Sequence, residues 1–175
     1  MVKNSDLARK IYQTSYLRGE FQLRSGAVSH EYFDKYLFES DPMLLNEIAQ
    51  EMSHFIPENV EALAGLEMGG IPIATVLCQI TGLPALFVRK EAKPYGSRKL
   101  AEGGSVDGKK LLIVEDVVTT GGQIIQAAQA LHQRGAVVED VVCVVDREAG
   151  GRENLANVGL HVQALFTMTD LKTAV

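Results

Sequence analysis

The stretch "LLIVEDVVTTGGQ", residues 111 to 123, decides the fold, because it joins a buried strand to the start of a helix. Its four apolar residues at 111–114 predict a core strand, and two carboxylates, Glu115 and Asp116, stand at the end of that strand. The residues "TTGGQ" then lead into a helix. In sheets built this way, ligands bind beyond the carboxyl ends of the strands, so this turn is a candidate binding site.

Strands and helices alternate on both sides of this stretch. Continuous apolar strands separated by single helices predict an α/β fold, with a central parallel sheet flanked by helices on both faces. Asp41 and Pro42 are typical of a helix start. The pattern predicts strands at 61–67, 84–90, 138–146 and 161–168, helices at 5–18, 41–56, 71–82 and 123–135, a hairpin within 21–38, and a short turn at 152–159.

The length, charge and composition of the chain limit the classes of protein to which it can belong. A chain of 175 residues that is 46% hydrophobic is most economically one domain. Its net charge of −5 argues against nucleic acid as a partner, since phosphate binding usually needs a basic face. Cys78 and Cys143 lie in apolar surroundings and predict free thiols in a reducing compartment. No stretch approaches the roughly 20 apolar residues of a membrane span, so we expect no membrane partner and a cytoplasmic protein.

The turn after the acidic pair suits a phosphate. Free backbone N–H groups and the dipole of the following helix attract an anion, and Gly121 and Gly122 allow the backbone to approach closely. Glycines also occur in such turns for steric reasons alone. The pair Glu115 and Asp116 favours the functional interpretation, because desolvated carboxylates destabilise a core edge unless something compensates for them. Sugar hydroxyls or a divalent cation would do so, which predicts a ligand with both ribose and phosphate.

The stretch from 111 to 122 resembles the phosphoribosyl pyrophosphate motif of the type I phosphoribosyltransferases: a hydrophobic strand, two acids, two apolar residues, then a threonine- and glycine-rich turn. The resemblance implies that Glu115 and Asp116 hold the ribose hydroxyls and act catalytically by favouring positive charge on the sugar ring. The residues implied to surround the 5′-phosphate and ribose are Val117, Val118, Thr119, Thr120, Gly121, Gly122 and Gln123.

A basic loop, "RKEAKPYGSRKLAEGG" at 89–104, interrupts the alternation. It could be a solvated surface loop, but opposite a phosphate site it is better explained as a lid that excludes water. "RKEAK-x-Y-G" resembles the lid of the orotate branch of the family. This implies pyrophosphate binding by Arg89, Lys90 and the catalytic Lys93, with Tyr95 where many members have histidine.

Three more segments resemble the orotate branch. "GLEMGGIP" resembles its pyrophosphate turn, in which Gly69 and Gly70 would offer N–H groups; some members carry lysine at the place of Gly69. "FQLRSGAVSHEYFD" resembles its N-terminal hood, and "VVDREAGG" its base-binding segment. By this resemblance Arg24, Thr119 and Arg147 contact orotate, although Arg147 could instead close a loop through a salt bridge.

The resemblance spans residues 21 to 151, which is most of the chain, and implies an enzyme of this family. We expect one domain over 1–175, with hood elements at 1–40 and an α/β core at 41–175. The implied reaction joins orotate to 5-phosphoribosyl 1-pyrophosphate (PRPP), giving orotidine 5′-monophosphate and pyrophosphate for pyrimidine biosynthesis. Mg²⁺ would be held mainly by substrate and water, near Glu115 and Asp116. The family also implies a homodimer with shared active sites. Two alternatives stay open: a related transferase for another base, and a non-catalytic regulator that senses PRPP.

Overall fold

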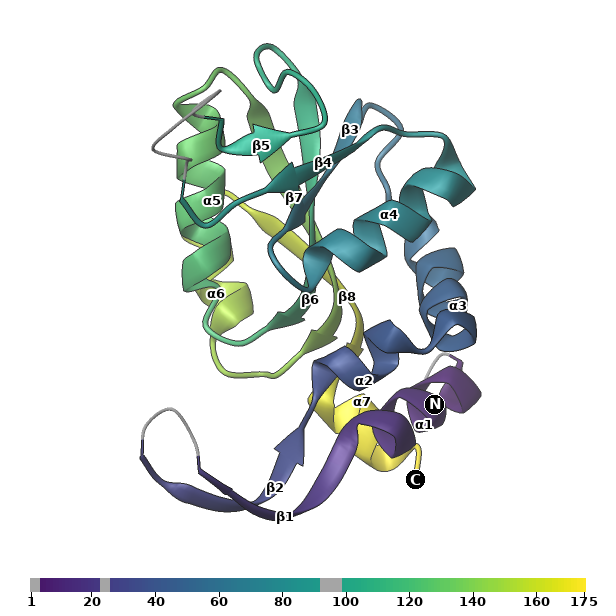
Figure 1. The fold of residues 1–175 in the computed structure, drawn as a ribbon. Coiled ribbons are helices and arrows are strands. Elements are labelled where there is room, and N and C mark those ends of the chain that lie inside the picture. The colour runs from purple at the N-terminus through teal and green to yellow at the C-terminus, as the bar shows by residue number, and fades with distance from the viewer. Residues whose placement is uncertain (1–3, 23–25, 92–98) are drawn as a thin grey trace.

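The computed structural model describes residues 4–22, 26–91 and 99–175. Within these ranges, six strands form the central sheet in the order β5-β4-β3-β6-β7-β8 (Figure 1). Five of them run parallel, and β5 pairs with β4 in the antiparallel sense at one edge. Strand β6 lies between β3 and β7, which puts the acidic pair in the middle of the sheet. The bounds are β3 (Ala62–Leu66), β4 (Ala85–Val88), β5 (Ala101–Glu102), β6 (Lys110–Val118), β7 (Val137–Asp146) and β8 (His161–Thr167).

Helices cover both faces of this sheet, as Figure 1 shows. Helices α3 (Pro42–Ser53) and α4 (Gly70–Thr81) lie on one face, and α5 (Gly122–His132) and α6 (Gly151–Ala156) on the other. Asp41 caps α3 by accepting from two backbone N–H groups, as its place before Pro42 predicts. Gly82 ends α4 in the left-handed conformation that glycine adopts without strain.

The N-terminal elements and the last helix lie at the end of the sheet where β6 and β7 finish (Figure 1). Two of them form an antiparallel hairpin that projects from this end. The elements are α1 (Ser5–Ser15), β1 (Tyr16–Gln22), β2 (Val28–Phe33), α2 (Lys35–Ser40) and α7 (Met168–Thr173). Asp34 caps α2 directly after the hairpin, so the hairpin and α2 are joined without a linker.

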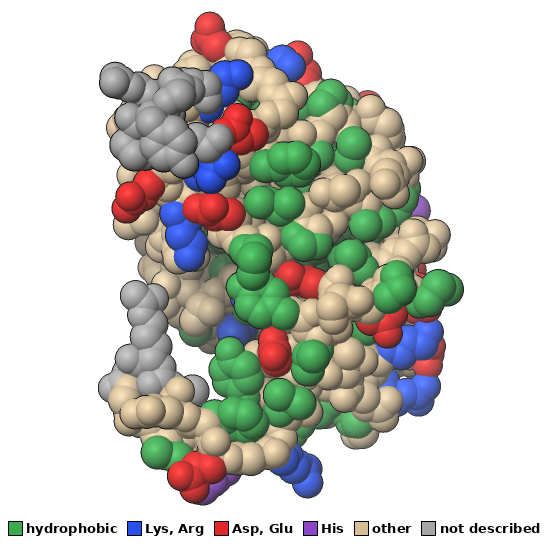
Figure 2. All heavy atoms as spheres, in the orientation of Figure 1, with side chains coloured by type: hydrophobic (Ala, Val, Ile, Leu, Met, Phe, Trp, Pro, Cys, Tyr) green, Lys and Arg blue, Asp and Glu red, His purple; other side chains and the backbone are tan. Residues whose placement is uncertain are grey.

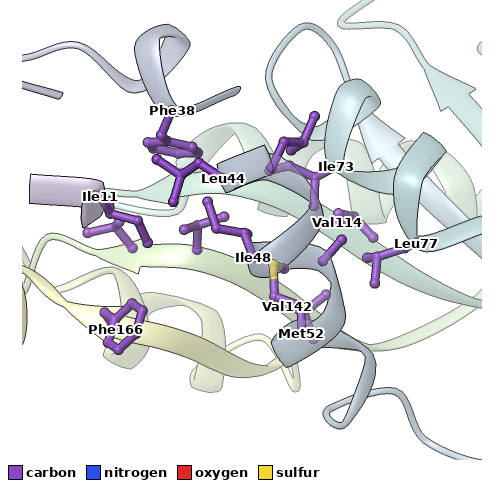
Figure 3. Packing of buried hydrophobic residues seen from close by; sticks show 14 of the residues in the cluster. Ile11, Phe38, Leu44, Ile48, Met52, Ile73, Leu77, Val114, Val142 and Phe166 are labelled. Carbon is purple, nitrogen blue, oxygen red and sulfur yellow. The ribbon is translucent and has the colours of Figure 1, made fainter. Parts of the chain in front are cut away.

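The core consists of two apolar clusters, one on each face of the sheet. Along β6, Leu112 and Val114 point into the first cluster, and Leu111 and Ile113 point into the second. This alternation follows from the two-residue period of a strand. Figure 3 shows the first cluster, where α1, α2, α3 and α4 meet the sheet through Ile11, Phe38, Leu44, Ile48, Met52, Ile73, Leu77, Val114, Val142 and Phe166.

The predicted α/β class with helices on both faces is confirmed, and several boundaries were wrong. The helix predicted at 5–18 ends at Ser15, because Tyr16 and Leu17 pair with β2 across the hairpin. Residues 35–40 form α2 and not part of the hairpin, and the predicted turn at 152–159 contains α6. Strand β6 runs on through the acidic pair to Val118, and the sheet gains β5 as an antiparallel edge. The elements α2, α6 and β5 are too short for a periodic sequence pattern to appear.

No helix in the described ranges has both the length and the apolar character needed to cross a membrane.

Candidate functional site

A cavity of about 440 Å³ opens beyond the carboxyl end of β6. Residues from three separate parts of the chain line it, and they meet there because β6 and β7 are parallel neighbours and the hairpin reaches the same end of the sheet. The lining residues are Tyr32, Phe33, Lys35, Glu115, Val117, Val118, Thr119, Thr120, Gly121, Gly122, Gln123, Ile124 and Arg147.

The phosphate turn (residues 119–123) forms one wall of this cavity. Gly121 has a φ of 78°, a left-handed conformation that favours glycine, and it places the first residues of α5 at the cavity. The turn is supported from below by α6, since Asn154 Nδ2 donates to the Thr120 carbonyl at 3.0 Å. The N-terminus of an 11-residue helix therefore faces the cavity with its unpaired N–H groups, as phosphate binding requires.

The two acids of the pair leave β6 on opposite faces of the sheet, although their carboxyl groups remain in contact. Glu115 lines the cavity, whereas Asp116 is completely buried on the other face of β6 and does not line it. Asp116 Oδ1 accepts from the Val117 N–H at 2.5 Å, and its Oδ2 lies 2.6 Å from Lys35 Nζ. Because β6 continues through both residues, adjacent side chains fall on opposite faces of the sheet. The two carboxylates therefore have different surroundings.

The electrostatics of the acidic pair follow from these surroundings. Burial raises the pKa of Glu115 well above its usual range, and the neighbouring Asp116 adds to the effect. Burial also raises the pKa of Glu39 to about 9, again reinforced by Asp116. For Asp116 itself burial opposes ionisation, but hydrogen bonds with Glu115 and Lys35 outweigh it and lower the pKa. Asp116 and Lys35 thus carry the charges of this cluster, and the two glutamates hold their protons more strongly than usual.

A second cavity of about 220 Å³ adjoins the first, and Glu115 and Gln123 line both. Arg89 and Lys90, at the end of β4, line this second cavity. The Lys90 backbone N–H donates to Glu67 Oε1 at 2.5 Å, which fixes the start of the basic loop against the β3–α4 turn. The described part of the basic loop therefore places Arg89 and Lys90 along a cavity that Glu115 also lines, whereas Arg147 lines only the first cavity.

Gly69 and Gly70 are buried under the acidic pair and line neither cavity. A Cβ at residue 70 would lie 2.1 Å from the Val114 carbonyl oxygen, and one at residue 69 would lie 1.6 Å from Asp116 Oδ2. Both positions exclude a side chain, so these glycines allow α4 to pack closely on β6. Their predicted role in binding pyrophosphate remains a prediction.

The predicted site residues divide into three groups. Glu115, Thr119 and Arg147 meet in the first cavity with the rest of the phosphate turn, and Arg89 and Lys90 lie in the second. Asp116, Gly69 and Gly70 lie beneath the cavities. Arg24, Lys93 and Tyr95, with the centre of the basic loop, lie outside the described residues.

Sequence reasoning missed Lys35 and Glu39. Their spacing of four residues is a signal for one helix face, but it could be used only if α2 had been predicted.

The described residues contain no group of three histidine, cysteine, aspartate or glutamate side chains arranged to hold a metal ion. Asp116 has Lys35 against one oxygen, and Glu115 alone of the pair reaches the cavity. These residues do not form a resident metal site by themselves.

Comparisons with known proteins agree with this geometry. The family model described as "Phosphoribosyl transferase domain" matches residues 42–162. An orotate phosphoribosyltransferase from Nocardioides sp. is 49% identical over 174 residues, covering 99% of this chain and 97% of that protein. The chain belongs to the type I phosphoribosyltransferase family, among the orotate phosphoribosyltransferases. Another member, from Methanocella arvoryzae, is 41% identical over 96% of this chain and 97% of its own length.

Solved structures of the family have the same fold. The orotate phosphoribosyltransferase of Mycobacterium tuberculosis in complex with PRPP matches with a TM-score of 0.83 and 29% identity, over 96% of this chain and 98% of that one. The same enzyme in complex with Fe(III) dicitrate gives a TM-score of 0.84 at 31% identity, over 95% and 97% of the two chains.

Proposed function

We propose that this chain transfers the phosphoribosyl group of PRPP to orotate, giving orotidine 5′-monophosphate and pyrophosphate. The observation that carries the proposal is the convergence of Glu115, the phosphate turn and Arg147 on one cavity of about 440 Å³. An acceptor for sugar hydroxyls, an anion site at a helix N-terminus and a guanidinium for a carboxylate are the three groups that this pair of substrates requires.

Each wall of the cavity takes one part of the substrates in this proposal. The N–H groups of the phosphate turn bind the 5′-phosphate, and Glu115 accepts hydrogen bonds from the ribose. Arg147 pairs with the orotate carboxylate from the loop after β7. Arg89 and Lys90 bind pyrophosphate in the second cavity, which adjoins the first at Glu115. The other residues proposed to contact the substrates are the catalytic Lys93, Tyr95 and Arg24.

The reaction exchanges one bond at C1′ of the ribose. The bond from C1′ to the pyrophosphate oxygen breaks, the bond from C1′ to N1 of orotate forms with inversion, and N1 loses its proton. Positive charge grows on the sugar ring while neither bond is complete. Glu115, the acid of the pair that lines the cavity, favours that charge when it is ionised, and the cations of the second cavity favour the departing pyrophosphate. Positioning accounts for much of the remaining rate, because both reactants lie against fixed backbone.

Mg²⁺ enters this proposal as part of the substrate. The divalent ion is held mainly by the pyrophosphate and water, with Glu115 as the residue of the acidic pair placed to contribute an oxygen. When bound, the ion offsets the negative charge of the pyrophosphate.

We also propose that the chain works in the cytoplasm as a homodimer with shared active sites, and that residues 1–40 act as the hood over a core at 41–175. Figure 2 shows hydrophobic side chains gathered over β4 and α4. Exposed apolar residues there and in the turn before α4 include Met68, Ile80 and Phe87. Exposed apolar side chains gathered on one face in this way fit a partner subunit.

A turnover assay tests the function directly. Orotate absorbance is followed with PRPP in the presence and absence of Mg²⁺, and an Arg147→Ala variant is compared with an Arg134→Ala variant. Arg134 is a surface arginine that hydrogen-bonds the Ala130 carbonyl and lines neither of the two cavities, and it serves as the control. Turnover that depends on Mg²⁺ and falls only with Arg147→Ala supports the proposal. Turnover of a purine base in place of orotate would refute it.

A further inference from the structure

Lys35 connects the cavity to the buried side of the acidic pair. It is the first residue of α2, directly after the Asp34 cap, and its side chain is 33% exposed and lines the cavity. Its Nζ lies 2.6 Å from Asp116 Oδ2. Lysine has three N–H donors and no acceptor, so this contact uses one donor.

The Asp116 carboxylate has a close neighbour at each of its two oxygens. One oxygen accepts from the Val117 N–H at 2.5 Å, and the other faces Lys35. A Cβ at residue 69 would lie 1.6 Å from Asp116 Oδ2, 2.4 Å from its Cγ and 2.8 Å from Glu39 Oε1. The carboxylate therefore occupies the space that a side chain at residue 69 would fill, and glycine at that position is what makes room for it.

The charge of Asp116 needs a cation nearby. Two other carboxyl groups, Glu39 and Glu115, border the buried carboxylate. Like charges at this distance disfavour ionisation, and an isolated buried carboxylate is strongly destabilising. The Lys35 ammonium compensates this charge from α2, one helical turn before Glu39.

Asp116 in turn fixes the residue that faces the substrate. The Asp116 backbone N–H lies 3.3 Å from Glu115 Oε1 and donates to it. A chain of contacts thus runs from Lys35 through Asp116 to the carboxyl group at the cavity.

We propose that Lys35 is a positioning residue for the ribose site: it holds Asp116 against Gly69 and so fixes the strand end from which Glu115 reaches PRPP. This inference rests on the proposed function, since it places the ribose of PRPP at Glu115. It assigns a role in sugar binding to the helix that directly follows residues 21–34, the segment whose resemblance implies base binding.

The test separates PRPP binding from turnover. Lys35→Met, which keeps the length of the side chain and removes the charge, is compared with Lys35→Arg and with Lys110→Met. Lys110 is paired with Glu139 at 2.7 Å at the opposite end of the same strand, β6, and is the matched control. PRPP affinity with Mg²⁺ is measured by calorimetry without orotate, and KM is measured for both substrates.

We expect Lys35→Met to weaken PRPP binding and raise its KM at least about tenfold, equivalent to about 1.4 kcal/mol. The KM for orotate should stay within about twofold, the scatter of independent substitutions. Lys35→Arg should recover most of the affinity, and Lys110→Met should match the wild type. An unchanged PRPP affinity in Lys35→Met, or an equal loss in Lys35→Arg, would overturn the inference.

A double-mutant cycle covers the case in which Lys35→Met does not fold. Asp116→Asn removes the buried charge, so the double variant contains no uncompensated ion. We expect Lys35→Met to cause little further loss of PRPP affinity in the Asp116→Asn background, whereas additive losses would contradict the coupling. A further outcome is that the wild type binds PRPP, with weaker binding in Lys35→Met, and yet does not consume orotate. In that case the proposed function fails and the positioning role of Lys35 stands.

Discussion

Two neighbouring glycines, Gly150 and Gly151, allow a sharp test of how the phosphate turn is held. A Cβ at Gly151 would lie 2.5 Å from the Thr119 carbonyl oxygen and 2.6 Å from Val118 Cγ1, and ordinary contacts begin near 3.4 Å. A Gly151→Ala substitution must therefore push the phosphate turn away by about 1 Å. At Gly150 a Cβ would meet nothing within 4 Å, but φ is +83°, so Gly150→Ala introduces strain without a clash.

Gly150→Ala and Gly151→Ala are expected to lose similar amounts of stability but different amounts of activity. In Gly150→Ala, the left-handed backbone conformation of an alanine lowers the free energy of unfolding by about 1–2 kcal/mol. In Gly151→Ala, overpacking by one methyl group lowers it by about 1–3 kcal/mol. For a chain of this length, each kcal/mol lowers the midpoint of thermal unfolding by about 2–4 °C. A displacement of about 1 Å at a site that positions a substrate can lower kcat/KM on the order of 100-fold. Gly151→Ala should show that loss, and Gly150→Ala should remain near the wild type.

The measurements are the unfolding midpoint and kcat/KM for PRPP in the wild type and both variants. Gly150→Ala serves as the stability control, because it perturbs the same loop without touching the turn. Normal kinetics in Gly151→Ala would refute the inference that α6 sets the position of the phosphate turn. An equal loss of activity in both variants would show that general destabilisation explains the effect.

Three further outcomes are expected. Gly122→Ala places a methyl group at the turn surface, where the nearest atom is Thr120 Oγ1 at 3.9 Å; stability should be unchanged while calorimetry shows PRPP binding about tenfold weaker. Asp116→Asn and Lys93→Ala should each greatly reduce turnover while circular dichroism shows an intact fold, and near-normal rates in either would count against the site. Because burial and Asp116 raise the pKa of Glu39 from 4.5 to about 9, the unfolded chain releases this proton first, and stability falls as pH rises between those values. Between pH 5 and pH 9 the unfolding midpoint should fall less for Glu39→Gln than for the wild type. An equal fall of the midpoint with pH in both proteins would contradict the raised pKa of Glu39.

Much of the main cavity could be predicted from sequence because it depends on local patterns. The four apolar residues before Glu115 identify a core strand, and the glycines after Thr120 identify the turn. Arg147 and Thr119 stand 28 positions apart, yet they follow neighbouring parallel strands, whose carboxyl ends meet at one sheet edge. Parallel α/β topology therefore brings them together without any knowledge of side-chain packing.

The contacts of the acidic pair could not be predicted in the same way. Placing the strand end before Glu115 suggested one shared role for two adjacent acids. Strand β6 in fact continues to Val118, and the two-residue period then sends Glu115 and Asp116 to opposite faces. The partner of Asp116, Lys35, is 81 residues away on a six-residue helix whose pattern was too short to detect.

The glycine at residue 69 gains a physical explanation from these contacts. Some members of the family carry lysine at this place, but in this chain Asp116 fills the space that a side chain at residue 69 would need. The cation comes instead from α2, at Lys35, two residues after Phe33 of the hairpin. Since Tyr32 and Phe33 line the cavity together with Arg147, the segment proposed to border the base also supplies the cation that is paired with Asp116. Because Asp34 alone separates Phe33 from Lys35, we expect a shift of the hairpin to change the environment of Asp116, so Lys35 connects the hairpin to the buried side of the acidic pair.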